Sequence, residues 1–278
     1  MSAPPYERVG DLPVAPSPSG VPGALTDPDS VRASALRYRG ADGEPIGAYL
    51  AEPAAPGRRP GMIVIHEAGG LGEHIRDVSN RFAALGYTVL APDLFTREGG
   101  PPDRDNLTEL IGRLAAMPDE RVLGDLSAAA ALLRSRADAT GAVGCIGFCM
   151  GGRYTLLFAC ARSELQAAID CWGGFIDAAT PTERASRQRP TPPLELAPAL
   201  SCPLMAAFGA QDTNPSPAVA AQLQSALATC PHEVQIDIYE GAGHAFFADY
   251  RPSYRPQAAA ALWERVVPFL RSHLPLEA

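Results

Sequence analysis

The sequence contains no lysine, and all 23 of its basic residues are arginine. Without lysine, the chain has neither the amine for Schiff-base chemistry nor the lysine of a phosphate-binding P-loop. It also has no run of basic residues, and its formal net charge of −8 argues against a nucleic-acid partner. No apolar run approaches the roughly 18 residues that a membrane-spanning helix needs, so no membrane partner is expected either.

Cysteine is scarce, and its spacing excludes two common uses. The six cysteines form neither a disulfide framework nor a C-x-x-C zinc pattern, so we expect free thiols and no bound metal or other cofactor. The first residues lack the basic and apolar regions of a signal peptide. A cytoplasmic protein with reduced thiols is therefore predicted.

The 278 residues are enough for one large α/β domain. Residues 1–30 are rich in Pro, Ser, Gly and Asp, which predicts an N-terminal arm that lies extended on the surface or is partly disordered. Residues 31–278 are predicted as a single domain with a loop insertion around 177–200. That insertion either packs beside the site entrance or is a surface loop, and the domain is expected as a monomer or homodimer.

Strand and helix patterns alternate along the predicted domain. Continuous apolar runs such as Gly61–His66 predict buried strands, and the spacing of Ile75–Leu85 predicts a helix. This alternation predicts an α/β fold with a mostly parallel, doubly wound sheet of about eight strands and helices on both faces. Further strands are predicted at 31–39, 46–52, 88–92, 143–148, 167–171, 204–208 and 233–239, and further helices at 106–116, 118–136, 153–161, 216–228 and 257–273.

A strand-to-helix turn in the middle of the chain has the pattern of a nucleophile elbow, with Cys149 where G-x-S-x-G has serine. The tip residue must take a strained backbone conformation, and a side chain at Gly147 or Gly151 would collide with the neighbouring strand and helix. At a helix N-terminus the peptide dipoles favour a thiolate, and free N–H groups can meet an oxyanion. By itself, the motif also fits a buried cysteine in a tight turn.

Three polar residues each follow a predicted strand: Cys149, then Asp212, then His244. The order nucleophile, acid, histidine is that of the α/β hydrolases. In such a triad the cysteine attacks, the histidine moves the proton, and the aspartate fixes the histidine tautomer. Singly, Asp212 also fits a helix or turn cap and His244 a loop histidine, but their joint order favours the triad.

The chain resembles the dienelactone hydrolase family of α/β hydrolases over about residues 31–273. The resemblance implies that it hydrolyses a small-molecule lactone (dienelactone-like) or related ester through a thioester on Cys149, with Asp212 and His244 completing the triad. It rests on HEAGGL (66–71), APDLF (91–95), GFCMGGR (147–153), CPLMAAFGAQD (202–212) and YEGAGHAFF (239–247).

The same resemblance implies further site residues. The active-site glutamate of the family falls on Glu67, and the oxyanion donors fall on the backbone N–H groups of Met150 and of the Glu67-Ala68 segment. The arginine that binds a substrate carboxylate falls on Arg97. Glu67 could accept the proton of Cys149 or hold its thiolate in reserve, and we favour control of Cys149 ionisation over mere capping of the glycine-rich loop.

Some assignments stay open at this point. Arg81 and Arg153 are the alternatives to Arg97, although Arg81 fits the solvent face of a helix and Arg153 fits a structural role. Trp172 and Phe246 could bind substrate in an apolar pocket or belong to the core. A carboxylesterase or thioesterase could use the same triad, and a non-catalytic thiol-based redox or binding protein could share the scaffold.

Overall fold

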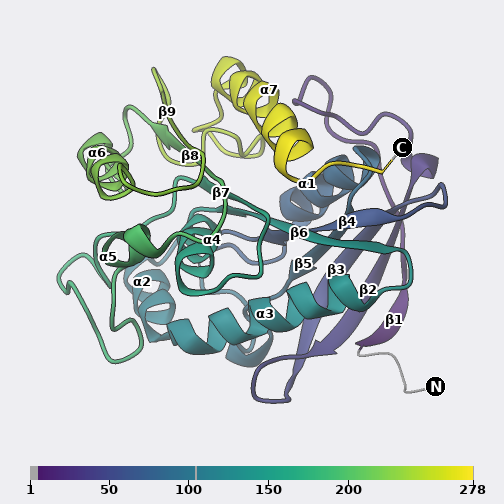
Figure 1. Cartoon of the computed structure of the whole chain (residues 1–278), viewed down its shortest axis with the longest axis horizontal. Coiled ribbons are helices and arrows are strands. Elements are labelled where there is room, and N and C mark those ends of the chain that lie inside the picture. Colours follow the sequence, from purple (N-terminus) through teal and green to yellow (C-terminus); the bar gives the residue numbers. More distant parts are fainter. Residues whose placement is uncertain (1–5, 104, 278) are drawn as a thin grey trace.

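The computed structural model describes residues 6–103 and 105–277, and within them nine strands form one sheet (Figure 1). The strand order is β1-β2-β3-β5-β4-β6-β7-β8-β9. In this order, the neighbouring pairs β1-β2, β2-β3 and β3-β5 are antiparallel, and all pairs from β5-β4 onward to β8-β9 are parallel. The strands are β1 (Tyr6–Leu12), β2 (Val31–Arg39), β3 (Pro45–Pro53), β4 (Arg59–Ile65), β5 (Thr88–Pro92), β6 (Ala139–Phe148), β7 (Ala167–Cys171), β8 (Leu204–Gly209) and β9 (Val234–Tyr239).

Helices cover both faces of the sheet, as predicted (Figure 1). The side chains of β4 alternate between the two layers: Met62 and Val64 pack with α1 and α7, whereas Ile63 and Ile65 pack with α3 and α4. None of the helices in the described part of the chain is long and apolar enough to cross a membrane. The helices are α1 (Glu73–Ala84), α2 (Leu107–Ala116), α3 (Asp119–Ser135), α4 (Met150–Ala161), α5 (Pro193–Leu196), α6 (Pro217–Ala226) and α7 (Pro256–His273), with 3₁₀ turns η1 (Pro28–Ser30), η2 (Thr96–Glu98) and η3 (Ala197–Ala199).

The N-terminal arm is more ordered than its composition predicts, and it accounts for the ninth strand. Its residues Tyr6–Leu12 form β1, which pairs antiparallel with β2. The arm then crosses α1, where Ser17 donates a hydrogen bond to Asp77 and Arg81 donates one to the carbonyl of Pro22 at 3.2 Å. Tertiary pairing therefore replaces the local order that the proline-rich sequence lacks. Residues 1–5 of the predicted arm lie outside the described residues.

The predicted insertion at 177–200 carries only the short helix α5 and the turn η3. It is fixed to the body of the protein by Arg189, whose side chain is buried with 2% of its surface exposed. The guanidinium of Arg189 donates to the carbonyl of Leu114 at the end of α2 and to the carbonyl of Ala179, the latter at 3.3 Å. Arg189 thus links the insertion, through Ala179, to the end of α2, through Leu114, by hydrogen bonds to main-chain carbonyls.

A buried ion pair joins the first turn of α4 to the first residue of α3. Arg153, 1% exposed, donates to both carboxylate oxygens of Asp119 at 2.7 and 3.0 Å. This bidentate geometry matches the planar guanidinium to the carboxylate and fixes the relative position of the two helices. Arg153 therefore has the structural role that the sequence indicated.

Replacing Arg153 with methionine should lower the free energy of unfolding by about 3–5 kcal/mol, because the Asp119 carboxylate would stay buried without its partner. Urea denaturation followed by circular dichroism measures this change. The control is Arg162→Met at the end of α4, which removes an exposed ion pair with Glu120 and should change the stability by less than about 1 kcal/mol. Equal losses in the two variants would contradict the structural role of Arg153.

Candidate active site

Cys149 occupies a sharp turn between β6 and α4. Its backbone has φ 55° and ψ −113°, and the next residue, Met150, begins the helix. A Cβ on Gly151 would overlap the carbonyl of Ile65 in β4, and one on Gly147 would overlap the carbonyl of Gly151. The two glycines thus let the helix meet the sheet without intervening side chains, and this agrees with the predicted elbow.

Cys149, Asp212 and His244 come together at one place in the fold. The Nδ1 of His244 lies 2.8 Å from Oδ2 of Asp212, and His244 is close enough to Cys149 for the two side chains to interact. The other Asp212 oxygen, Oδ1, accepts the backbone N–H of Asn214 at 2.9 Å. Because Asp212 fixes Nδ1 as the donor, Nε2 is the nitrogen left to exchange a proton with the sulfur. This arrangement is one that a nucleophile, a base and an orienting acid would require.

The surroundings of His244 stabilise its protonated form. Burial lowers the pKa of His244, but the neighbouring Cys149 and Asp212 outweigh it and raise that pKa from 6.5 to about 10. An imidazolium beside the sulfur favours the thiolate, which is the nucleophilic form of cysteine. His244 is therefore protonated at neutral pH and places a positive charge near the Cys149 sulfur.

The predicted oxyanion donors lie on either side of the contact between β4 and α4. Met150 is the first residue of α4, and the first N–H groups of a helix have no intrahelical acceptor. Ala68 follows the end of β4, where the carbonyls of Ile65 and His66 border the space beside Gly151. The two segments that should carry the donors are thus neighbours.

His66 fixes the backbone of this loop. It is fully buried, its Nδ1 lies 2.7 Å from the carbonyl oxygen of Glu67, and its Nε2 accepts the N–H of Leu94 at 3.1 Å. Since Nε2 accepts, Nδ1 must donate, so the ring is neutral. Burial lowers the pKa of His66, which agrees with that form. His66 is thus structural and lies directly after the end of β4.

Both carboxylate oxygens of Glu67 are held by a loop that follows His244. Tyr250 donates its hydroxyl to Oε1, and Arg251 donates to Oε2 at 2.9 Å. Arg251 also donates to the Tyr250 oxygen at 2.9 Å, so the three side chains form one network. Burial and the Glu67 carboxylate raise the pKa of Tyr250, which keeps its hydroxyl protonated as the donor.

The sequence did not identify Tyr250 and Arg251. The available signal was a tyrosine and an arginine in the loop that carries His244, close in sequence to a triad member. That signal does not reveal Glu67 as their partner, because Glu67 lies at the end of β4, 184 residues before Arg251. Only the fold brings the two loops together.

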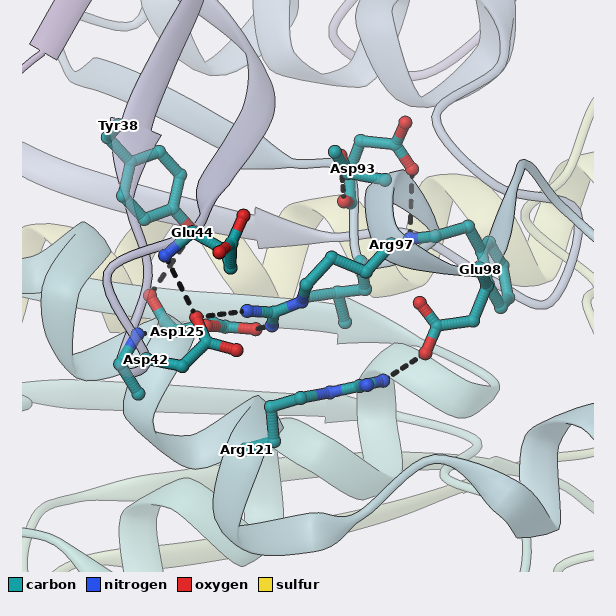
Figure 2. Close-up of polar contacts among 12 residues, drawn as sticks. Tyr38, Asp42, Glu44, Asp93, Arg97, Glu98, Arg121 and Asp125 are labelled. Atoms are coloured by element: carbon teal, nitrogen blue, oxygen red, sulfur yellow. Dashed lines mark hydrogen bonds and ion pairs between the residues drawn. The ribbon is translucent and has the colours of Figure 1, made fainter.

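Arg97, predicted to bind a substrate carboxylate, is placed elsewhere. Figure 2 shows its guanidinium directed toward Asp42 and Asp125, with Nη1 at 2.7 Å from Asp42 and Nη2 bonded to Asp125. Asp125 is a buried residue of α3, so Arg97 supplies the opposite charge that it needs. Arg97 thus connects η2 to α3 and to the turn between β2 and β3. Its positive charge is paired with these two carboxylates.

Three other assignments are corrected or decided by burial. Arg81 is not on a solvent face: it is 1% exposed, because the N-terminal arm covers it, and it pairs with Asp77. Trp172 and Phe246 are fully buried and pack against each other with ring centroids 4.7 Å apart. They belong to the core behind the site and do not form a substrate-contacting wall.

In the described ranges, 6–103 and 105–277, no group of three or more His, Cys, Asp or Glu side chains is placed to hold a metal.

The doubly wound sheet, the elbow and the order of the three site residues define an α/β hydrolase. A sequence profile described as "Dienelactone hydrolase family" matches residues 46–274. The chain belongs to the dienelactone hydrolase family and is a carboxylic ester hydrolase.

Individual relatives agree with the profile. A protein of Escherichia coli K12 named "Putative carboxymethylenebutenolidase" is 34% identical over 248 residues, 88% of this chain and 89% of the relative. A Bradyrhizobium protein named "Probable 2-oxo-3-(5-oxofuran-2-ylidene)propanoate lactonase" is 30% identical, over 84% of this chain and 92% of the relative's length. The crystal structure titled "Putative Dienelactone Hydrolase" from Klebsiella pneumoniae superposes with a TM-score of 0.78 at 31% identity, covering 86% of this chain and 98% of the other.

Replacing His244 with asparagine should lower the rate of Cys149 alkylation by iodoacetamide at pH 7 by about tenfold or more, because the imidazolium that stabilises the thiolate is lost. The raised pKa of about 10 means that wild-type His244 carries its proton below that pH and loses it above. The wild-type rate should therefore be nearly level from about pH 7 to 9, whereas the variant rate should rise steeply. Stopped alkylation with peptide mass spectrometry measures both, and His232→Asn is the control. Superimposable profiles for His244→Asn and wild type would count against the ion pair.

Proposed function

We propose that the protein hydrolyses a lactone of the dienelactone type, or a closely related ester, with Cys149 as the nucleophile. The observation that carries this proposal is the chain from Asp212 through His244 to Cys149 at the tip of the elbow, with 2.8 Å between His244 and Asp212. The names of the relatives, which include a lactonase and carboxymethylenebutenolidases, support the same substrate class.

The proposed reaction has two halves. The Cys149 sulfur attacks the lactone carbonyl carbon, and the N–H groups of Met150 and Ala68 receive the negative charge that forms on its oxygen. The tetrahedral intermediate collapses, the ring C–O bond breaks, and His244 gives its proton to the departing oxygen, which leaves a thioester. His244 then takes a proton from water, the hydroxide attacks the thioester, and the Cys149 thiolate departs with release of the acid.

The nucleophile itself favours an enol lactone over a simple ester. A thiolate is a good leaving group, so the tetrahedral intermediate reverts to substrate unless the substrate's own leaving group is better. An enolate departs more readily than an alkoxide, and ring opening of an enol lactone therefore meets this requirement. A carboxylesterase or thioesterase activity on activated acyl groups would use the same steps and is the second candidate.

Replacing Cys149 with alanine should abolish lactone hydrolysis, leaving a rate at least about 10³-fold lower, because no thioester can form. Rapid-quench mass spectrometry of the wild type with 4-nitrophenyl acetate should show an acetyl group on the Cys149 peptide that disappears as turnover is completed. Full hydrolysis by the Cys149→Ala protein, or acylation only at another residue, would overturn the mechanism.

Arg251 is the cation best placed to meet a substrate carboxylate. It pairs with Glu67, the carboxylate next to the proposed oxyanion loop, and it remains 31% exposed. Its pKa is raised: burial opposes the charge, but Glu67 and Tyr250 outweigh it. A carboxylate on the substrate would thus find a charged, accessible guanidinium, in competition with Glu67.

This competition gives Glu67 a role in the control of Cys149. While Arg251 and Tyr250 hold the Glu67 carboxylate, both of its oxygens are occupied as acceptors. An anionic substrate on Arg251 would release one of them, and the freed negative charge would change how Cys149 and His244 share their proton. We propose that Glu67 influences Cys149 ionisation in this way, coupled to the charge of the substrate.

Replacing Arg251 with glutamine should raise KM for a carboxylate-bearing dienelactone by about tenfold or more, because a charge-assisted hydrogen bond is lost. KM for the uncharged 4-nitrophenyl acetate should change much less. Steady-state kinetics with both substrates measure the difference. Arg255→Gln serves as control because, among the described residues, the side chain of Arg255 bonds only to nearby backbone carbonyls. An equal rise in KM for the charged and uncharged substrates would contradict the assignment.

A further inference from the structure

A cleft of about 660 Å³ separates the N-terminal arm from the start of α1. Small-molecule sites in proteins commonly have volumes of about 300–1,000 Å³. The three triad residues do not line this cleft, but Glu67 and Tyr250 do. It is therefore distinct from the nucleophile's own surroundings and shares one wall with the network that holds Glu67.

The arm wall of the cleft lies outside the part of the chain that defines the family. The family profile matches residues 46–274, whereas this wall consists of five residues between positions 12 and 18. It is mainly apolar, with Tyr49 of β3 and Ile75 of α1 adding to the apolar lining from the opposite side. The arm residues are Leu12, Pro13, Ala15, Pro16 and Pro18.

The charged groups of the cleft are largely neutralised by partners. Asp77 pairs with Arg81, and Asp249 lies 2.7 Å from Nδ1 of His74. Glu67 pairs with Arg251 as described above. The remaining two, Glu73 and Arg76, are exposed and of opposite sign. Apart from these two exposed charges of opposite sign, the lining offers no uncompensated charge to an ionic ligand, so an uncharged occupant fits best.

Asn80 supplies the polar contact. It is 5% exposed and lines the cleft, and its Oδ1 accepts the hydroxyl of Tyr49 at 2.8 Å. Within residues 6–103 and 105–277 no hydrogen bond from its Nδ2 is formed, and this nitrogen is not among the fully buried atoms without a partner. An accessible amide donor in the lining of a cleft can pair with an acceptor that enters the cleft. An acceptor oxygen on a ligand would complete the hydrogen bonding of Asn80.

We propose that this cleft is a binding site for an uncharged, largely apolar molecule or substrate substituent that carries a carbonyl oxygen. The oxygen accepts a hydrogen bond from Nδ2 of Asn80, and the apolar part lies between the prolines of the arm, Tyr49 and Ile75. The occupant also contacts Glu67 and Tyr250, so its binding affects catalysis. That last link depends on the function proposed above, whereas the binding itself does not.

The binding test uses 4-phenylbutan-2-one as probe and isothermal titration calorimetry as the measurement. All proteins carry Cys149→Ala, so that the ketone cannot add to the thiol. Asn80→Asp keeps an acceptor for Tyr49 but removes the donor, and Ala15→Trp fills the cleft from the exposed arm. Each should weaken binding by about tenfold or more, since a tenfold change corresponds to about 1.4 kcal/mol, the scale of one hydrogen bond.

The matched control is Ser19→Trp, which places the same bulk on an exposed arm residue outside the lining and should leave binding unchanged. Urea denaturation of all variants separates a lost site from a lost fold. Absence of probe binding to the Cys149→Ala protein would overturn the proposal. Binding that Ala15→Trp and Asn80→Asp leave as tight as in the control would overturn it as well.

A kinetic test on proteins that retain Cys149 identifies the source of the occupant. Here 4-nitrophenyl acetate is compared with 4-nitrophenyl 4-oxo-6-phenylhexanoate, whose acyl group ends in the same 2-phenylethyl ketone unit as the probe. If the cleft holds a substrate substituent, the ratio of kcat/KM for the long ester to that for the acetate falls about tenfold in Ala15→Trp relative to Ser19→Trp. If it holds a separate molecule, this ratio is the same in both variants, and the ketone changes acetate hydrolysis in Ser19→Trp only.

The kinetic outcomes also distinguish a failure of the proposed cleft from a failure of the proposed hydrolase function. An equal ratio together with no effect of the ketone would overturn the link to Glu67. A wild-type protein that hydrolyses neither ester would count against the proposed function, and the calorimetric result would still decide whether the cleft binds the probe.

Discussion

The close approach of α4 to the sheet is the constraint on which the site depends. Because Gly151 has no side chain, the first turn of the helix meets the carbonyls at the end of β4, and Gly147 gives the same freedom on β6. This contact places the Cys149 sulfur, the N–H of Met150 and the loop that begins at Glu67 beside one another. The buried ion pair between Arg153 and Asp119 then holds the helix from behind. The position of Cys149 at the elbow is thus a consequence of backbone packing.

The parts that the sequence predicts are those whose signals are local. Glycines flanking Cys149 mark the elbow, and Asp212 and His244 were predicted because each follows a predicted strand. Arg97 was assigned by resemblance, and its true partner Asp125 lies 28 residues further along the chain. Arg81 was misjudged because its helix is amphipathic in isolation, whereas in the fold the arm covers it. Likewise, β1 exists only through its pairing with β2.

Every residue of the lysine and arginine class in this sequence is an arginine, and some of these arginines are buried. Arg153 meets a carboxylate with both arms of its fork, while Arg189 bonds only to uncharged oxygens: two backbone carbonyls and, at 3.5 Å, the hydroxyl of Tyr154. Burial lowers the pKa of Arg189, yet the reference pKa of an arginine is so high that the group keeps its proton. A lysine in the same position would lose its charge more readily and offers no planar fork. The absence of lysine is therefore compatible with a core that contains several fixed positive charges.

The strand β1 also determines how the sheet ends. An edge strand presents unpaired backbone groups, which invite a strand from another copy of the chain. In β1 the ladder is irregular between Arg8 and Gly10, and three of its seven residues, Glu7, Arg8 and Asp11, are charged. The strand beneath it, β2, pairs with β3 over nine residues without a break in register. By covering that regular strand with an irregular, charged one, the N-terminal segment protects the fold against aggregation through its sheet edge.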